Sequence, residues 1–241
     1  MKRYSVVSTK GGTGKTTTVH NLAAALHQLG KSVLMVDLDP QSNLSYAAGK
    51  FISDGGIFDV ISGHLAWAQT VQNIRDGLDI ISADHRLVYL ENKKDLHLLQ
   101  TAFKGVRSYD SLLIDCPPSM GYLTQSALIA TGEYLLPLQP EYLAMRNVAS
   151  LIQLVAELKA DRRDLQLAGV VLSMYNTRRK LSSEGADIIK QHFGKKVFKT
   201  VIKNTVAITE AAAQETDVIT YRPSSPGAAD FINLGREVIR R

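Results

Sequence analysis

A short segment near the start of the chain combines glycines, lysines and threonines at a spacing suited to phosphate binding. It follows the apolar pair Val6 and Val7 and reads Thr9-Lys10-Gly11-Gly12-Thr13-Gly14-Lys15-Thr16-Thr17-Thr18. Glycines let the backbone curl so that several N–H groups point at one phosphate, and the N-terminus of a following helix adds partial positive charge. We expect Lys15 to reach the β- and γ-phosphates of a nucleotide, Thr16 to ligate Mg²⁺ and Thr17 to contact the α-phosphate. The alternative, a glycine-rich turn with no ligand, is disfavoured because a strand-like run precedes the segment and a helical pattern follows it.

Two later segments carry the acidic residues that such a site needs. Asp37 and Asp39 follow the apolar run 33–36, and Asp115 closes the segment 109–115. Open α/β sheets bind ligands at the carboxyl ends of their strands, where these side chains would lie. We expect Asp115 to hold a water of the Mg²⁺ shell, Asp39 to orient the attacking water and Asp37 to support the metal site. One such aspartate alone is often a strand-end cap, but three beside a phosphate loop favour a functional site.

The elements that must position these residues alternate between strand-like and helix-like patterns. Short β-branched or aliphatic runs predict strands at 4–8, 32–37, 78–82, 111–115, 134–138, 167–173 and 197–201. Apolar residues at helical spacing predict helices over 19–29, with Gly30 as a stop, and over 148–158 and 228–241. This alternation is typical of parallel strands joined by crossover helices. We therefore predict an α/β fold in a single domain, residues 1–241, with a mostly parallel twisted sheet flanked by helices on both faces.

Composition excludes several classes of protein. The chain has 241 residues, 45% of them hydrophobic, one cysteine and a formal net charge of +5. No apolar run reaches the roughly 18 to 20 residues of a membrane span. Cys116 alone cannot form an internal disulfide, so we expect a reducing compartment, the cytoplasm. Residues 159–203 carry eleven Lys or Arg and four Asp or Glu, a net of +7, which indicates either an anionic partner or an ordinary solvated face.

Taken together, these segments resemble the ParA branch of the ParA/MinD family, the DNA-partitioning ATPases. The resemblance is carried by KGGTGKTT, DLDPQSN, YDSLLIDCPPSMG and LQPEYLA, and late in the chain by TVIKNTVAITEAAA and RPSSPGA. Thr9 stands where the general phosphate-loop pattern has its first glycine, and Lys10 matches the additional lysine that marks this family. The resemblance implies a P-loop NTPase fold, ATP and Mg²⁺ as cofactors, and ATP hydrolysis that is slow without a partner.

The resemblance further implies a homodimer in which two subunits face each other across two ATP molecules. Lys10 of one subunit would reach the phosphates bound by the other, which makes Lys10, Lys15 and Asp39 the expected catalytic residues. Glu141 matches a position that approaches the partner's ribose, and Asn176 and the backbone around Lys203 and Thr205 match the adenine-binding region. The expected nucleotide-binding set is Lys10, Gly11, Gly12, Thr13, Gly14, Lys15, Thr16, Thr17, Glu141, Asn176, Lys203 and Thr205; the expected metal set is Thr16, Asp37, Asp39 and Asp115.

The late motif departs from the family pattern where some relatives contact DNA. Relatives of the short chromosomal type usually have Pro-Arg-Asn-Val-Arg where this chain has Lys203-Asn204-Thr205-Val206-Ala207, so the second arginine is missing. DNA contacts would then come from other cations and go to phosphates, which makes them salt-sensitive and independent of sequence. The available cations are Arg178, Arg179, Lys180, Lys195, Lys196, Lys199, Lys203 and Arg222.

These features predict a cytoplasmic, nucleoid-associated partition ATPase with no membrane contact. It would dimerise on ATP, bind nucleoid DNA, and hydrolyse ATP when a ParB-like or other cargo adaptor stimulates it, so that plasmid or chromosomal DNA is segregated. One alternative is an ATPase of the same fold that positions a protein cargo such as a carboxysome or a chemoreceptor cluster. Another is a MinD-like membrane-surface regulator, which would need an amphipathic tail beyond the last core helix. An iron–sulfur reductase of the nitrogenase type is excluded, because it needs two cysteines per subunit.

Overall fold

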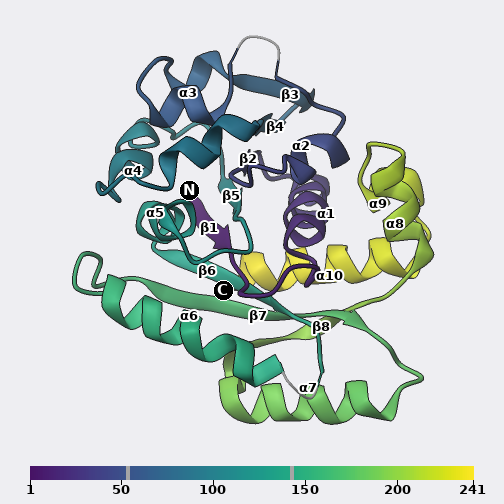
Figure 1. Ribbon diagram of the computed structural model, residues 1–241. Coiled ribbons are helices and arrows are strands. Elements are labelled where there is room, and N and C mark those ends of the chain that lie inside the picture. Colours follow the sequence, from purple (N-terminus) through teal and green to yellow (C-terminus); the bar gives the residue numbers. More distant parts are fainter. Residues whose placement is uncertain (53–54, 142–143) are drawn as a thin grey trace.

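A single eight-stranded sheet forms the centre of the molecule (Figure 1). The structure is a computed structural model that describes residues 1–52, 55–141 and 144–241. The strands lie in the order β3-β4-β2-β5-β1-β6-β7-β8, and all neighbours are parallel except β3 and β4. The strands are β1 (Lys2–Val6), β2 (Val33–Asp37), β3 (Val71–Arg75), β4 (Leu78–Ile81), β5 (Ser111–Asp115), β6 (Glu133–Leu138), β7 (Gln166–Tyr175) and β8 (Val197–Lys203).

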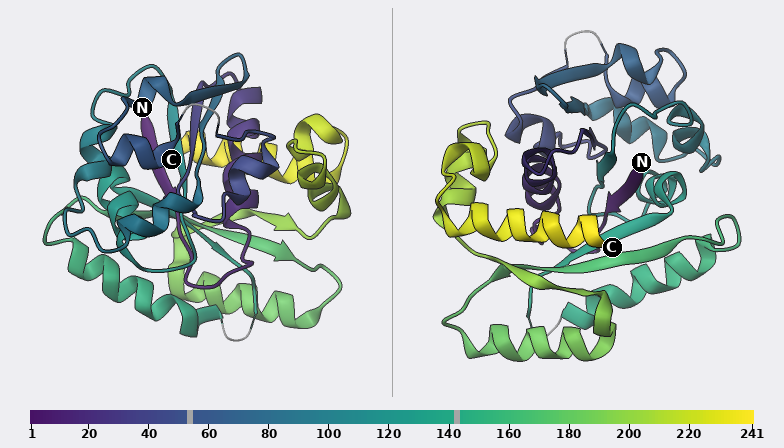
Figure 2. Two further views of the ribbon diagram at one scale, coloured as in Figure 1. Left: turned by 45° about the horizontal axis from the view of Figure 1, so that its top comes forward. Right: turned by 180° about the vertical axis from the view of Figure 1, so that it is seen from behind.

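Helices cover both faces of the sheet, and each face has its own hydrophobic core. One face carries α1 (Lys15–Gln28), α2 (Asn43–Ala47), α8 (Val206–Ala213), α9 (Val218–Tyr221) and α10 (Pro226–Arg240). The other carries α3 (Ile57–Ile61), α4 (Leu98–Ala102), α5 (Tyr122–Thr131), α6 (Ala144–Leu158) and α7 (Lys180–Phe193). Short 3₁₀ helices occur at η1 (Trp67–Gln69), η2 (His85–Leu90) and η3 (Gly194–Lys196). Figure 2 shows α1 and α10 on one side of β7 and β8, with α6 and α7 on the other.

This architecture confirms the predicted fold class, including each of the seven predicted strands. The strand that sequence reasoning missed is β3, whose residues Val-Gln-Asn-Ile-Arg are polar in the middle and only partly buried. It pairs with β4 alone, antiparallel, through a turn in which Gly77 has φ +80. An edge strand of this kind need not be apolar on both faces, so it lacks the pattern by which the buried parallel strands are found. In the described part of the chain, no helix is both long enough and apolar enough to cross a membrane.

The position of β1 creates the crevice in which a ligand can bind. β1 lies between β5 and β6. From β1 the chain passes through α1 to β2 on the β5 side, whereas β6, β7 and β8 extend the sheet in the other direction. Ligand sites of open α/β sheets form where the strand order reverses in this way, outside the carboxyl ends of the strands. The glycine-rich loop between β1 and α1 lies at this point.

Helix α10 offers a direct test of the packing. Leu234 is fully buried in the core that α10 shares with α1, whereas Ile239, on the same helix, is 43% exposed. We expect Leu234→Ala to lower the free energy of unfolding by about 2–5 kcal/mol, because it removes buried contacts and leaves a cavity. The matched control Ile239→Ala should change it by about 0.5 kcal/mol or less. Urea denaturation followed by circular dichroism measures both values, and equal losses would contradict the packing described here.

Candidate functional site

The loop between β1 and α1 has a backbone geometry that glycine adopts readily. Gly12 and Gly14 have φ values of +71 and +84, in the left-handed region. Helix α1 begins at Lys15, directly after Gly14, and no side-chain hydrogen bond caps its first turn. Uncapped N–H groups at a helix N-terminus, together with the helix dipole, favour an anion at this place. The loop therefore has the geometry of a phosphate-binding site.

A buried hydrogen bond from β7 fixes this loop. The hydroxyl of Ser173, near the end of β7, donates to the carbonyl oxygen of Thr13 at 2.7 Å. On the strand side of the loop, the Val7 N–H donates to the carbonyl of Leu135, which lies on β6. Sequence reasoning missed Ser173, because no motif spacing connects a strand serine with a loop 160 residues earlier. Its contact ties the conformation of the phosphate loop to the far half of the sheet.

Lys15 and Asp115 are both buried and lie close enough for their charges to interact. Asp115 ends β5 beside β1, and neither of its carboxylate oxygens has a hydrogen bond of good geometry within the described residues. Burial raises the pKa of Asp115 well above its usual value and the charge of Asp37 raises it further, while the Thr16 hydroxyl and Lys15 oppose the shift. A buried carboxylate without partners is costly. Waters held by a divalent cation would satisfy these oxygens, so the residues fit Mg²⁺.

The protein side chains alone do not form a metal cage. Across the described ranges, no three His, Cys, Asp or Glu side chains are grouped to hold one ion. In nucleotide sites Mg²⁺ keeps several waters and is held by few protein groups together with the phosphates. Thr16, in the first turn of α1, and Asp115 are the residues that suit this mode of binding.

Asp37 holds the loop that follows β2. One of its oxygens accepts a hydrogen bond from the Asp39 N–H at 3.1 Å, and the other accepts from the N–H and the hydroxyl of Ser45 at 2.8 and 2.7 Å. Burial raises the pKa of Asp37 to about 6, although the hydrogen bonds from Ser45 oppose the rise. Asp39 in turn accepts from the Gln41 N–H at 2.9 Å. Asp37 therefore positions Asp39 and the start of α2, while metal binding by either aspartate stays a prediction.

The two lysines of the loop lie in different environments. Lys15 is 7% exposed, whereas the Lys10 side chain is 48% exposed. The Lys10 ammonium forms an ion pair with Glu141 at 2.9 Å, and the Glu141 side chain is also about half exposed. Both residues are expected to serve the partner subunit, and here they contact each other within one chain. Lys10 is therefore not one of the buried groups around Asp115.

A pocket beside the loop has a lining suited to a nucleobase. Its volume is about 210 Å³, and it lies between the loop at Gly14, the end of β7 at Met174, the turn before α8 at Thr205, and Phe231 of α10. The Thr205 hydroxyl oxygen is buried without a hydrogen-bond partner in the described part of the chain. Gly227 leaves room for it, since a Cβ at that position would lie 2.9 Å from this oxygen. An apolar pocket with one unpartnered polar group is typical of a small-ligand site.

The other two residues expected near the adenine differ in their contacts. Lys203 lines this pocket, but its ammonium pairs with Asp230 at 2.7 Å. Asn176 is not among the lining residues, and its side-chain oxygen accepts from the Arg178 N–H at 2.9 Å in the turn after β7. Sequence reasoning missed Phe231 as a lining residue, because an apolar side chain that faces a ligand has the same helical spacing as one that faces the core.

The cations expected to contact DNA do not form one group. Arg178, Arg179, Lys180 and Lys203 lie at the carboxyl edge of the sheet, where β7 and β8 end, and Arg222 follows α9. Lys195 and Lys196 lie at the opposite, amino edge, and Lys199 is near the start of β8. Ala207, which stands at the place of the missing arginine, is buried in the core. The sequence cluster of positive charge is thus divided between two faces of the molecule.

Comparison with known proteins agrees with this geometry. A family model described as an AAA domain matches residues 1–167. The chain is 36% identical to the chromosome-partitioning ATPase Soj of Thermus thermophilus, over 100% of this chain and 96% of the relative.

Solved structures show the same fold with nucleotide and metal bound. One is cobyrinic acid a,c-diamide synthase from Mycobacterium smegmatis with an ATP analog and magnesium: 26% identity, TM-score 0.86, covering 100% of this chain and 95% of that one. Another is the septum site-determining protein MinD of Pyrococcus horikoshii with Mg-ADP: 28% identity, TM-score 0.82, covering 98% and 95%. Both bound groups agree with the phosphate loop and the unpartnered Asp115 described above, and ATP and Mg²⁺ are the cofactors. The chain belongs to the ParA/MinD family of P-loop ATPases.

Proposed function

We propose that the protein is a partition ATPase that dimerises on binding ATP, and that this dimerisation is required for both DNA binding and hydrolysis. The ATP-bound dimer binds nucleoid DNA through phosphates, and a ParB-like or other cargo adaptor stimulates hydrolysis and so releases the protein. The protein acts in the cytoplasm on the nucleoid and without a membrane. The chromosome-partitioning relative supports this assignment, and the switch would serve either plasmid or chromosomal DNA.

One observation carries the proposal: Lys15 is buried in the loop, while Lys10 is half exposed on Glu141. In hydrolysis, water attacks the γ-phosphorus and the bond from this phosphorus to the bridging β-phosphate oxygen breaks. Negative charge therefore develops on that bridging oxygen. Lys15 lies where it can neutralise this charge, and Asp39, held by Asp37, is the residue that orients the water. Mg²⁺, held through Thr16 and Asp115, adds positive charge. Lys10 would complete the site only from a second subunit, which ties turnover to dimerisation and makes an isolated monomer slow.

The ion pair between Lys10 and Glu141 must break when the dimer forms in this scheme. Lys10 must exchange the carboxylate for phosphate oxygens when two subunits close. Because both side chains are about half exposed, the pair is weak, about 0–1 kcal/mol, and the exchange is easy. Glu141 is thereby freed to approach the partner's ribose, as the resemblance implies.

Loss of Lys10 should separate dimerisation from nucleotide binding. We expect Lys10→Ala to abolish ATP-dependent dimerisation while ADP still binds, because Lys15 and the loop N–H groups remain. Light scattering with ATP measures the mass, and calorimetry with ADP checks binding. Glu141→Gln is the matched control: it breaks the same ion pair but keeps Lys10 and a side-chain oxygen that can accept from a ribose hydroxyl, so it should still dimerise. A Lys10→Ala variant that dimerises like the unaltered protein would contradict the role of Lys10.

A variant at Thr205 tests whether the pocket beside the loop binds the base of the nucleotide. Because its oxygen is buried and unpartnered, Thr205→Val should leave the stability of the nucleotide-free protein unchanged or slightly higher. It should weaken ATP binding about 5- to 10-fold, the equivalent of one lost hydrogen bond. Thr209→Val, at an exposed residue that lines the same pocket, is the control. Thermal unfolding and ATP titration measure the two effects, and unchanged ATP affinity in Thr205→Val would mean that the base lies elsewhere.

DNA binding distinguishes the partition ATPase from the alternatives. We expect binding to non-specific duplex DNA to be stronger with ATP than with ADP or no nucleotide, and to weaken steeply between 50 and 300 mM salt. Fluorescence anisotropy over a salt series in the three nucleotide states measures this. The absence of binding at low salt in every state would remove the nucleoid from the proposal. The remaining candidate would then be an ATPase that positions a protein cargo without using nucleoid DNA. If the protein binds anionic vesicles instead of DNA, the membrane-surface regulator would be favoured.

A further inference from the structure

The hydrogen bond from Ser173 to the phosphate loop acts on a peptide group that lies between two glycines. Thr13, whose carbonyl oxygen accepts from the Ser173 hydroxyl at 2.7 Å, stands between Gly12 and Gly14. Both glycines have positive φ values, and glycine adopts either sign of φ at little cost. Without an anchor, the peptide group that joins Thr13 to Gly14 can therefore turn over between two orientations.

The orientation of this peptide group decides where its N–H points. The peptide bonds of the described residues are all trans, and in a trans peptide the C=O and the N–H point in opposite directions. Because the Thr13 carbonyl points at β7, the Gly14 N–H points away from β7. Among the described residues, none accepts a hydrogen bond from this N–H, which directly precedes the uncapped first turn of α1. The N–H is therefore free to donate to a phosphate.

Both partners of the anchoring hydrogen bond are shielded from water. Ser173 is 3% exposed and Thr13 is 4% exposed. In a buried position water cannot replace the donor, and a carbonyl that loses its donor there carries a desolvation cost. Ser173 therefore holds the Thr13–Gly14 peptide more firmly than an exposed hydroxyl would.

Strand β7 departs from regular alternation at the residue after Ser173. Val170 and Leu172 pack in the core that faces α6 and α7, and Val171 packs in the core that faces α1. Ser173 follows two residues after Val171 and lies on the same side, as the period of a strand requires. Met174 should then lie on the side of Leu172, but it lines the pocket beside the loop together with Ser173. Two consecutive residues of one strand thus face the same pocket.

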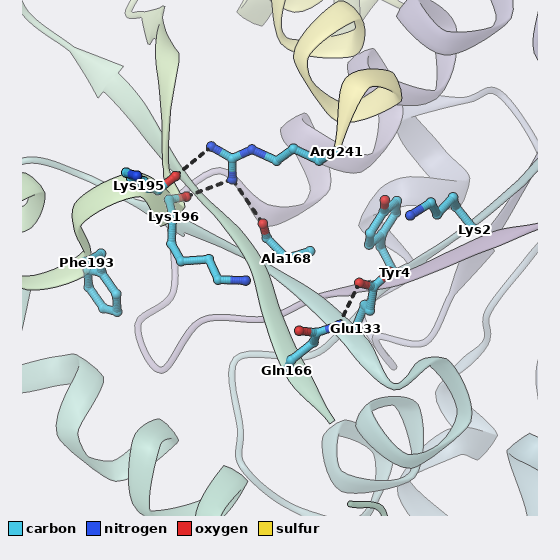
Figure 3. A pocket seen from close by; sticks show the side chains of 9 residues that line it. All are labelled: Lys2, Tyr4, Glu133, Gln166, Ala168, Phe193, Lys195, Lys196 and Arg241. Carbon is cyan, nitrogen blue, oxygen red and sulfur yellow. Dashed lines mark hydrogen bonds between the residues drawn. The ribbon is translucent and has the colours of Figure 1, made fainter. Parts of the chain in front are cut away.

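The opposite end of β7 shows the ordinary pattern. Gln166 and Ala168, two residues apart, line the same hollow at the amino edge of the sheet (Figure 3). Leu167, between them, packs against the core on the other face. This alternation is what an undisturbed strand gives. The arrangement of Ser173 and Met174 is therefore a local feature of the end that meets the phosphate loop.

A β-bulge accounts for the departure. Between Leu172 and Tyr175, both paired with β8, the register shifts: two residues of β7 stand opposite one residue of β8. Met174 has φ +51, in the left-handed region that residues other than glycine seldom adopt. After it the alternation is displaced by one residue, since Tyr175 packs against the core that contains Leu172. Bulges of this kind redirect side chains and are frequent beside active sites.

The bulge brings two side chains of β7 against Gly14. A Cβ built at Gly14 would lie 3.7 Å from the Ser173 Cβ and 3.9 Å from the Met174 terminal methyl. A left-handed conformation at a residue other than glycine persists only where its surroundings enforce it, and such residues cluster at ligand sites. The strained backbone of Met174 thus has a local consequence: a second side chain packs on the residue whose N–H faces the ligand.

We propose that Ser173 is a positioning residue of the nucleotide site and that the bulge at Met174 supports it. The Ser173 hydrogen bond keeps the Thr13–Gly14 peptide in the orientation that presents the Gly14 N–H to a phosphate before the nucleotide arrives. Preorganisation of this kind raises affinity, because the loop does not have to be ordered on binding. This assignment rests on the proposed function and deepens it at the ATP site, but it involves neither DNA nor a cargo adaptor.

The position of Ser173 predicts an effect on binding and not on the chemical step. Without its hydroxyl, part of the protein has the peptide turned over and cannot bind nucleotide. The apparent Kd for ADP and for ATP then rises by the inverse of the competent fraction. Once nucleotide is bound, the loop is in the correct orientation and kcat is retained. A group that stabilised the transition state would lower kcat instead.

Ser173→Ala tests this division. We expect it to weaken Mg-ADP binding about 3- to 10-fold, the equivalent of one hydrogen bond. The KM for ATP should rise by a similar factor, while kcat stays within about 2-fold. Calorimetry with Mg-ADP and steady-state hydrolysis of Mg-ATP measure these values. Ser173→Thr keeps the hydroxyl and should restore most of the lost affinity.

Ser5→Ala is the matched control. Ser5 lies on β1, is also fully buried, and accepts a hydrogen bond from the hydroxyl of Thr131 on α5 at 3.2 Å. The same substitution therefore removes a buried hydroxyl and its hydrogen bond without touching the phosphate loop. It should lower the midpoint of thermal unfolding but leave the affinity for Mg-ADP unchanged. Equal losses of affinity in Ser5→Ala and Ser173→Ala would mean that general destabilisation is the cause.

Two variants of Met174 test the bulge. Met174→Gly and Met174→Val both shorten the side chain, but glycine adopts a φ of +51 freely, whereas a β-branched residue resists it. We expect the valine variant to bind Mg-ADP about 3-fold or more weakly than the glycine variant, because the bulge can no longer form without strain. If only the Met174 side chain mattered, glycine, which removes more of it, would give the weaker binding.

The outcomes separate this inference from the proposed function. If the unaltered protein binds neither Mg-ADP nor Mg-ATP, the proposed function fails. If the unaltered protein binds nucleotide and Ser173→Ala binds it equally well, or loses kcat without losing affinity, Ser173 does not position the loop while the ATPase stands. If the Met174→Gly variant binds as weakly as Met174→Val or more weakly, the bulge does not support Ser173. Thermal unfolding shows whether each variant still folds.

Discussion

Asp115 ends the strand beside β1 with two buried carboxylate oxygens that no described residue satisfies. A carboxylate in this state is costly, and its raised pKa expresses that cost as a preference for the protonated form. The protein tolerates it because Lys15 lies nearby and because a hydrated cation and phosphates can complete the shell. Binding of Mg²⁺ and nucleotide therefore offsets the free-energy cost of burying this carboxylate. Occupancy of the site is expected to stabilise the surrounding loops for this reason.

Asp37 extends this coupling away from the nucleotide. It is paired in register with Asp115 on the adjacent strand, and its charge raises the pKa of Asp115. Its oxygens are committed to the Asp39 N–H and to Ser45 at the start of α2. Asp37 thus connects the strand end that carries Asp115 with the segment that holds Asp39 and with α2. Segments tied to the site by a few hydrogen bonds are suited to respond to the presence or absence of a γ-phosphate.

The sequence predicts the phosphate loop and the core strands well, because both depend on local patterns. Left-handed backbone at Gly12 and Gly14 needs glycine, and a strand buried on both faces needs a continuous apolar run. The sequence does not predict contacts between distant segments whose residue types are ordinary. The hydrogen bond from Ser173 to Thr13 and the ion pair of Lys10 with Glu141 are of this kind. The edge strand β3 is not predicted for a related reason, since the sequence of a partly buried strand with a polar centre resembles that of a loop.

Charge is the property for which sequence alone is least informative. The segment 159–203 has a net charge of +7 in the sequence, yet β7 and β8 carry its cations to opposite edges of the sheet. At the carboxyl edge, beside the phosphate loop, Lys10 and Lys203 are balanced by Glu141 and Asp230, whereas Arg178 and Arg179 are exposed and form no ion pair with a described residue. At the amino edge the cations remain unbalanced. The charge beside the phosphate loop is therefore set by contacts between distant segments, Lys10 with Glu141 and Lys203 with Asp230, which no local sequence pattern predicts.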